Sequence, residues 1–144
     1  MHFKKLKIFF ALTFIVGLLS SYKVDPPYKN AKLPIAVRVK DLLGRMTLEE
    51  KVAQTQCLWQ SKQKLYTNKD FDYKKAADIM PNGMGQLARV NEGPAPINSY
   101  AGGLNGRQMA EWSNKIQKYF VENTRLGIPV IFHEESLHGN QAKD

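Results

Sequence analysis

The feature that most constrains the fold is an amphipathic segment, residues 105–123, which lies between two short apolar stretches. One apolar stripe runs along it at spacings of three or four, through Met109, Trp112, Ile116 and Tyr119 or Phe120. Such spacing is typical of an α-helix with one face in a protein core. Asn105 can cap this helix, with Gln108 at the third helical position, so we expect the helix to begin there.

The stretches on either side of this helix have the length of strands. MGQLARV (84–90) is bounded by Gly83 and NEGPAP, and IPVIF (128–132) follows NTRLG, which ends the helix. A strand, a crossover helix and a second strand form a βαβ unit, whose two strands run parallel. Parallel sheets contain further strands and are covered on both faces. About two strands plus helices are therefore an incomplete α/β domain.

The region before this unit is expected to be mostly helical. Apolar spacing predicts one helix over 35–45 and another near 73–80, which ends at PNG. The polar stretch KQKLYTNKDFDYKK (62–75) is expected to be a loop. A second loop is expected in EGPAPINSYAGGL (92–104), and long ordered loops are often functional.

A further helix is expected in MTLEEKVAQTQ. Thr47 and Glu50 have the spacing of a capping box, in which the hydroxyl accepts a backbone N–H and the carboxylate reaches back. Leu48, Val52 and Thr55 continue one face of this helix.

The first 21 residues have the organisation of a secretory signal peptide. MHFKKLK is basic, IFFALTFIVGLL is an apolar run of twelve, and SSYK supplies small residues for cleavage. A spanning helix needs about 20 apolar residues, so an uncleaved anchor is the less favoured alternative. The Pro-rich VDPPYKNAKLP indicates a linker over 22–34, and we expect the domain to occupy 35–144.

Cysteine usage bears on the compartment. Cys57 is the only cysteine, so no disulfide can form within these residues. Export without disulfides suits a bacterial envelope better than a small disulfide-rich secreted domain. We therefore expect an exported protein, periplasmic or extracellular.

The basic charge does not indicate a nucleic-acid partner. The net charge is +8, and Lys4, Lys5 and Lys7 of the signal segment supply three of those charges. The other basic residues are scattered, without a block or an aromatic-interleaved stripe. We expect no nucleic-acid partner, and no membrane contact beyond the signal peptide.

Four polar groups follow the second predicted strand directly, in IPVIFHEESLHG. They are His133, Glu134, Glu135 and His138. In parallel α/β folds ligands bind beyond the carboxyl ends of the strands. The position of these groups therefore favours a functional site.

Two kinds of site fit this pattern poorly. His133 and His138 are five residues apart, about 140° around a helix, whereas a zinc helix needs spacing of four. Glu135 and His138 match a Glu-x-x-His element, but di-iron bundles need two copies. We expect no metal and no cofactor. Glu134 and Glu135 are adjacent and diverge, so they are not the opposed carboxylate pair of a glycosidase.

Two interpretations of these residues remain open on chemistry alone. A carboxylate can accept two hydrogen bonds from vicinal hydroxyls, such as those of sugars. Alternatively, Glu134 or Glu135 favours the start of a following helix and His138 packs against the sheet.

Three stretches resemble glycoside hydrolase family 3, of the β-glucosidase/β-xylosidase type. RVKDLLGRMTLEEKVAQ (38–54) is similar to the opening helices of the family, and NGMGQLARV (82–90) to its first barrel strand. NKIQKYFVENTRLGIPVIFHEESLHG (114–139) is similar to the helix, strand and acidic loop that follow. The resemblance implies the N-terminal portion of a (β/α)8 TIM-type barrel, here incomplete.

The resemblance also implies an activity and residue roles. Family members hydrolyse β-linked glucosides or xylosides with retention, through an Asp nucleophile and a Glu acid/base. Glu135 would be a substrate-binding carboxylate for an oligosaccharide or β-glycoside. Glu134 and His138 would support it, and Arg89 is a weaker candidate at the end of the other strand.

The catalytic residues of the family belong to later segments. Neither the nucleophile, nor the acid/base, nor the family's sugar-binding Lys-His pair has a counterpart here, so we expect no catalytic residue in this chain. It is expected to be a truncated enzyme fragment, inactive alone. The rival hypothesis is a non-catalytic exported carbohydrate-binding or structural module.

Overall fold

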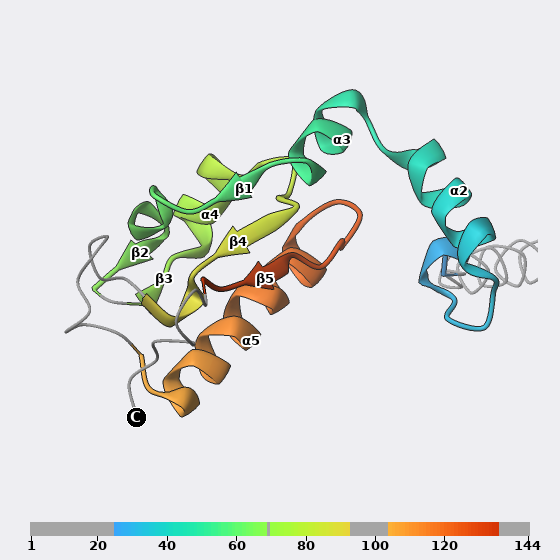
Figure 1. Ribbon diagram of the computed structural model, residues 1–144. Coiled ribbons are helices and arrows are strands. Elements are labelled where there is room, and N and C mark those ends of the chain that lie inside the picture. The colour runs from blue at the N-terminus through green and yellow to red at the C-terminus, as the bar shows by residue number, and fades with distance from the viewer. Residues whose placement is uncertain (1–24, 69, 93–103, 136–144) are drawn as a thin grey trace, which may run out of the picture. The chain divides into compact units, whose positions relative to one another are not determined.

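The computed structural model describes residues 25–68, 70–92 and 104–135 (Figure 1). They belong to two compact units that divide between Arg45 and Met46. The predicted signal peptide, His138 and nearly all of the predicted 92–104 loop lie outside the described residues. Within the described ranges, no helix is long and apolar enough to cross a membrane.

The first unit consists of η1 (Pro27–Lys29) and α2 (Ile35–Arg45). The bounds of α2 are those that the sequence predicts. The Tyr28 backbone N–H donates to Asp41 Oδ2 at 3.2 Å, and Arg45 Nε donates to the same oxygen at 2.9 Å. The Arg45 hydrogen bond holds the pKa of Asp41 below its usual range. Polar contacts therefore tie the segment before the helix to the helix itself.

The second unit contains a parallel sheet and an antiparallel ribbon. Its elements in chain order are α3 (Leu48–Gln54), β1 (Cys57–Leu58), η2 (Lys62–Leu65), β2 (Tyr66–Thr67), β3 (Asp70–Phe71), α4 (Tyr73–Ile79), β4 (Gln86–Ala88), η3 (Val90–Glu92), α5 (Gly106–Asn123) and β5 (Ile131–His133). The sheet order is β1-β4-β5 with both pairings parallel, and β2 pairs antiparallel with β3. The predicted α/β class and the parallel βαβ unit are confirmed.

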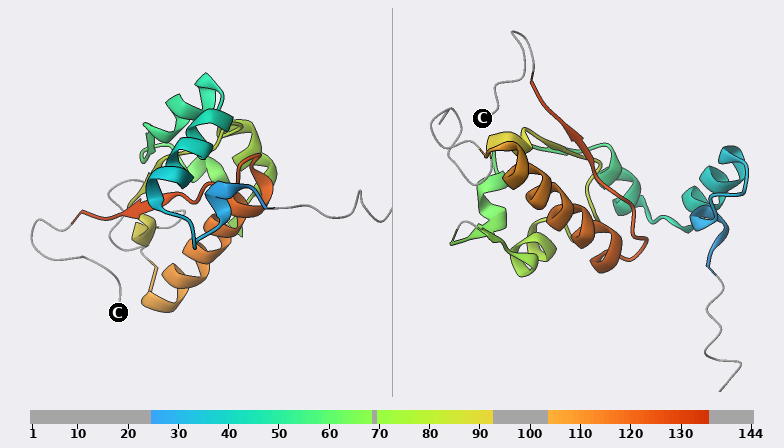
Figure 2. Two further views of the ribbon diagram at one scale, coloured as in Figure 1. Left: turned by 90° about the vertical axis from the view of Figure 1, so that its right-hand side faces the viewer. Right: turned by 90° about the horizontal axis from the view of Figure 1, so that it is seen from below.

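Helix α5, the crossover helix of the βαβ unit, packs as its apolar stripe predicts. Asn105 and Gln108 form a capping box at the start of α5. Ile116, Tyr119 and Phe120 are buried in one core cluster, with Met109 and Trp112 packed against it. Figure 2 shows α5 lying along one face of the sheet.

The register of the sheet separates a covered face from an open one. Leu58, Leu87 and Phe132 are paired neighbours, and all three belong to or pack against the α5 core. Side chains alternate along a strand, so the adjacent row faces the opposite way. That row consists of Cys57, Gln86 and Ile131, and all three are exposed, Ile131 by 64%. Among the described residues the sheet therefore has one face without a helix.

Helix α3 confirms its predicted cap but exposes its predicted apolar positions. Thr47 Oγ1 accepts the Glu50 N–H, and the Glu50 carboxylate accepts the Thr47 N–H at 2.9 Å. Leu48 is 71% and Val52 48% exposed, whereas Glu50 and Ala53 are buried. Helix α3 therefore turns Glu50 inward, where Arg125 binds its carboxylate.

The prediction of a loop over 62–75 is wrong. This stretch forms η2, β2, β3 and the start of α4. Leu65, Tyr66 and Phe71 are buried in the core, and the Tyr66 and Phe71 rings meet edge to face at 6.2 Å. Three apolar side chains among many polar ones show no clear period, so no local pattern predicts this ribbon.

Strand β1 is a further element that the sequence did not predict. Its two residues pair with Gln86 and Leu87. Just before β1, the end of α3 lies close to the start of β4, because the Gly85 N–H donates to the Ala53 carbonyl at 2.9 Å. A Cβ at position 85 would lie 2.0 Å from the carbonyl oxygen of Gln54. Glycine is therefore required where the end of α3 meets the start of β4.

We predict that Gly85→Ala destabilises the second unit by about 3 kcal/mol or more, because backbone must move to admit the methyl group. Urea denaturation followed by tryptophan fluorescence reports on this unit, since both Trp59 and Trp112 lie in it. Gly106→Ala is the matched control, because nothing lies within 4 Å of its added Cβ. Equal midpoints for the two variants would contradict the steric explanation.

Candidate functional site

The carboxyl ends of the three parallel strands bring together residues that are far apart in the sequence. Trp59 follows β1, Arg89 follows β4, and Glu134 and Glu135 follow β5. The Arg89 N–H donates to the His133 carbonyl at 2.8 Å, which extends the β4–β5 pairing beyond the strands. We call this set Trp59, Arg89, Glu134 and Glu135 the carboxyl edge.

Arg89 occupies an unusual backbone conformation at this edge. Its φ is +56°, in the left-handed region that residues other than glycine rarely adopt. Its Nη1 lies 3.2 Å from Glu92 Oε1, and its guanidinium lies 5.2 Å from the centre of the Trp59 ring. An arginine over an indole face is a cation–π contact. Trp59 remains 36% exposed, so part of this pair faces solvent.

A buried lysine supports the turn after β4. Lys62 in η2 has no exposed surface. Its Nζ donates to the Arg89 carbonyl at 2.8 Å and pairs with the Glu92 carboxylate. A buried ammonium requires such partners, because desolvation without them costs several kcal/mol.

Glu134 also contacts this turn, from β5. Its Oε1 accepts the Asn91 N–H at 2.9 Å, and its Oε2 is buried with no hydrogen-bond partner in the described part of the chain. Burial raises the pKa of Glu134, while the Asn91 N–H and the Lys62 ammonium partly oppose that rise. Glu134 therefore faces the protein interior and, like Lys62, holds the turn after β4.

Glu135 lies in a different environment from its neighbour. It is exposed, whereas Glu134 is half-buried. The difference follows from alternation along an extended chain, which sends successive side chains to opposite faces. Of the four residues that the sequence proposed for a sugar site, the edge brings together Arg89, Glu134 and Glu135. The fourth, His138, lies outside the described residues.

Sequence reasoning did not propose Trp59, Lys62 or Cys57 for this site. Trp59 and Lys62 reach it only through β1 and η2, which the sequence did not predict. Cys57 and His133 also meet on the open face, with Sγ and Nε2 3.3 Å apart. No group of three or more metal-ligating side chains gathers within the described ranges. The 76-residue separation of Cys57 and His133 left no local signal of their contact.

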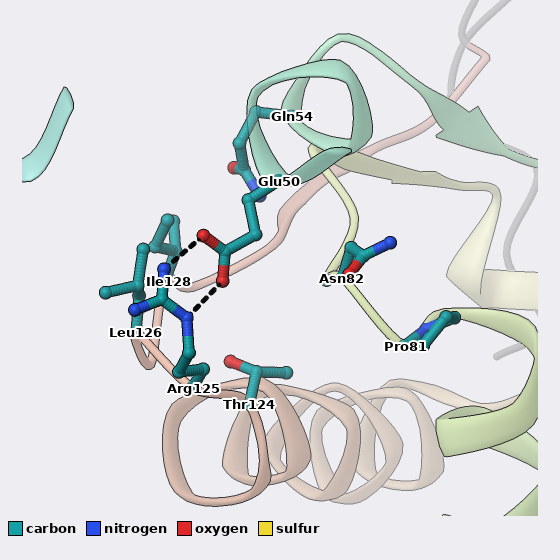
Figure 3. A pocket seen from close by; sticks show the side chains of 9 residues that line it. Glu50, Gln54, Pro81, Asn82, Thr124, Arg125, Leu126 and Ile128 are labelled. Atoms are coloured by element: carbon teal, nitrogen blue, oxygen red, sulfur yellow. Dashed lines mark hydrogen bonds and ion pairs between the residues drawn. The ribbon is translucent and has the colours of Figure 1, made fainter. Parts of the chain in front are cut away.

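A second candidate is a small pocket near the amino ends of the strands (Figure 3). Its lining includes Gln54, Gly83, Thr124, Arg125 and Glu50. Arg125 Nε donates to Glu50 Oε1 at 2.8 Å, and its Nη2 pairs with the second oxygen of that carboxylate. The hydrogen bonds from Arg125 hold the pKa of Glu50 below its usual value. This pocket contains an internal ion pair that joins α3 to the segment just after α5.

Two curated proteins are similar to the chain. One is named "Putative beta-xylosidase", from Formosa agariphila, with 33% identity over 127 residues, covering 85% of this chain and 15% of that protein. The other is named "Beta-glucosidase C", from Emericella nidulans, with 33% identity over 113 residues, covering 78% and 16%. The chain thus spans about one sixth of the length of these relatives. No protein-family model matches it. The similarities support a relationship to glycoside hydrolases.

We predict that Arg125→Gln lowers the free energy of unfolding by about 1 kcal/mol at pH 7, since Arg125 is 55% exposed and solvent weakens the pair. Glu50 has a folded pKa below its ordinary 4.5, so its stabilisation is present above that value and is lost as pH falls through the folded pKa. The deficit should therefore shrink in acid.

Urea denaturation at pH 7 and at pH 3 measures this effect. Arg107→Gln is the control, because Arg107 pairs with Glu111 on a helix surface where the side chains are 88% and 61% exposed. A deficit for Arg125→Gln that is equal at both pH values would show that the ion pair is not its cause.

Proposed function

We propose that this chain is the N-terminal part of a glycoside hydrolase of family 3, whose whole protein hydrolyses β-linked glucosides or xylosides with retention of configuration. The observation that carries the proposal is the similarity to proteins named as a β-xylosidase and a β-glucosidase. The position of Glu135 and Arg89 at the carboxyl edge of a parallel sheet supports it, because that edge is where α/β enzymes bind ligands.

In this proposal the three parallel strands begin a (β/α)8 barrel. The open row of Cys57, Gln86 and Ile131 would face the barrel interior, and α5 would belong to the outer ring of helices. A sheet with parallel strands and one helix-covered face has the arrangement of a barrel segment. The exposure of Ile131 in this row supports the assignment, since an apolar side chain gains by being covered.

The proposed role of this segment is to bind the sugar. The exposed Glu135 carboxylate accepts hydrogen bonds from two vicinal hydroxyls, and charge-assisted bonds of this kind are the stronger ones. The Arg89 guanidinium supplies donors beside it. Glu134 acts behind them by holding the Asn91 N–H. The nucleophile and the acid/base come from other segments of the whole protein, and the first 21 residues direct export.

We predict that the complete 144-residue chain binds methyl β-D-xyloside or methyl β-D-glucoside weakly and shifts the NMR signals of the Glu135 and Arg89 amides. Glu135→Gln should weaken binding about tenfold, because the carboxylate loses its charge-assisted hydrogen bonds. Glu111→Gln is the control, since Glu111 is an exposed glutamate on α5. Shifts elsewhere only, or unchanged affinity in Glu135→Gln, would refute the assignment.

We also predict that this chain alone does not release nitrophenol from nitrophenyl β-xyloside or β-glucoside. The reason is that a retaining mechanism needs two opposed carboxyl groups about 5–5.5 Å apart, and the two adjacent glutamates of the edge diverge. A spectrophotometric assay of the purified chain measures this. Turnover that survives Glu135→Gln would contradict the division of roles.

A further inference from the structure

Among the described residues of the second unit, Lys62 is the most deeply buried charged side chain. It has no exposed surface, and it reaches its partners across 26 to 30 residues of sequence. Its ammonium donates to the Arg89 carbonyl at 2.8 Å, is 3.5 Å from the Ala88 carbonyl, and pairs with the Glu92 carboxylate. Every one of these partners belongs to the end of β4 or to the turn after it.

Glu92 connects the buried lysine to the carboxyl edge. One oxygen of Glu92 accepts from Lys62, and the other lies 3.2 Å from Nη1 of Arg89. The Arg89 guanidinium in turn lies over the Trp59 ring at 5.2 Å. A continuous set of contacts therefore runs from the interior to a partly exposed arginine and indole.

The same turn carries the strained backbone of Arg89. A side chain in the left-handed region needs surrounding contacts that hold it there. Lys62 binds the Arg89 carbonyl from one side, the His133 carbonyl binds its N–H from another, and Glu134 binds the next residue but one through the Asn91 N–H. Of these three groups, only Lys62 also binds the Glu92 carboxylate, which pairs with the Arg89 side chain.

We propose that Lys62 is a positioning residue for sugar binding: through the Arg89 carbonyl and Glu92 it holds the guanidinium over Trp59, so that a cation and an aromatic ring face a neutral pyranoside together. This inference rests on the proposed function. Ligand sites combine aromatic surface with a few fixed polar groups, and donors held in place before binding lose less freedom when the sugar arrives.

The test compares Lys62→Met with the unaltered 144-residue chain by NMR. We expect the nuclear Overhauser contact between the Arg89 side chain and the Trp59 indole to disappear. Affinity for methyl β-D-xyloside should fall on the order of tenfold, as for loss of one charge-assisted hydrogen bond. Lys115→Met is the matched control, because it removes a surface ion pair with Asp70 whose partners are 49% and 62% exposed.

Glu92→Gln is the second variant and decides the matter if Lys62→Met does not fold. It leaves the lysine and its carbonyl partners in place but weakens the hold on Arg89, so it should lose the indole contact and reproduce the fall in affinity. All measurements are made well below the melting temperature of each variant.

The outcomes separate the two proposals. If either variant melts lower but keeps both the indole contact and the affinity, Lys62 has a structural role only and the inference is overturned. If the contact disappears in both variants while the unaltered chain binds no glycoside, Lys62 does position Arg89 and the proposed function fails instead.

Discussion

The second unit depends on the central position of β4. This strand pairs with β1 on one side and β5 on the other, and it carries the fully buried Leu87 into the α5 core. Its start is reached by the end of α3 so closely that only glycine fits at position 85. Its end continues into the turn that Lys62 holds. Both the packing of the unit and the geometry of the carboxyl edge therefore follow from the placement of one short strand.

The polar groups of this unit are arranged by the same strand. At the amino end of the sheet, the Glu50 carboxylate belongs to the capping box of α3 and also pairs with Arg125, so it links α3 to the segment just after α5. At the carboxyl end, Lys62 and Glu134 hold the turn after β4 from two sides. Buried charges are tolerated in proteins when every one has a partner. These networks leave Glu135 as the exposed carboxylate of the edge.

Elements with a strong local signal could be predicted from the sequence. The stripe along α5, its Asn105 cap and the Thr47–Glu50 capping box all agree with the structure. The failures have a common cause. Strands β1 to β3 have two residues each, too few for a period to be visible, and they are stabilised by partners elsewhere in the chain. The exposed face of α3 shows the same effect, because a distant arginine decided which side of that helix turns inward.

By itself the sequence determined the α/β class, the parallel βαβ unit and the position of a polar cluster just beyond β5. Those features depend on spacing within about twenty residues, which hydrophobic periodicity and helix caps record directly. Only the tertiary structure decided which glutamate is exposed, that Arg89 lies over Trp59, and that a buried Lys62 supports both the turn and its arginine. Those contacts join residues 27 or more positions apart, and no local pattern encodes a partner at that distance.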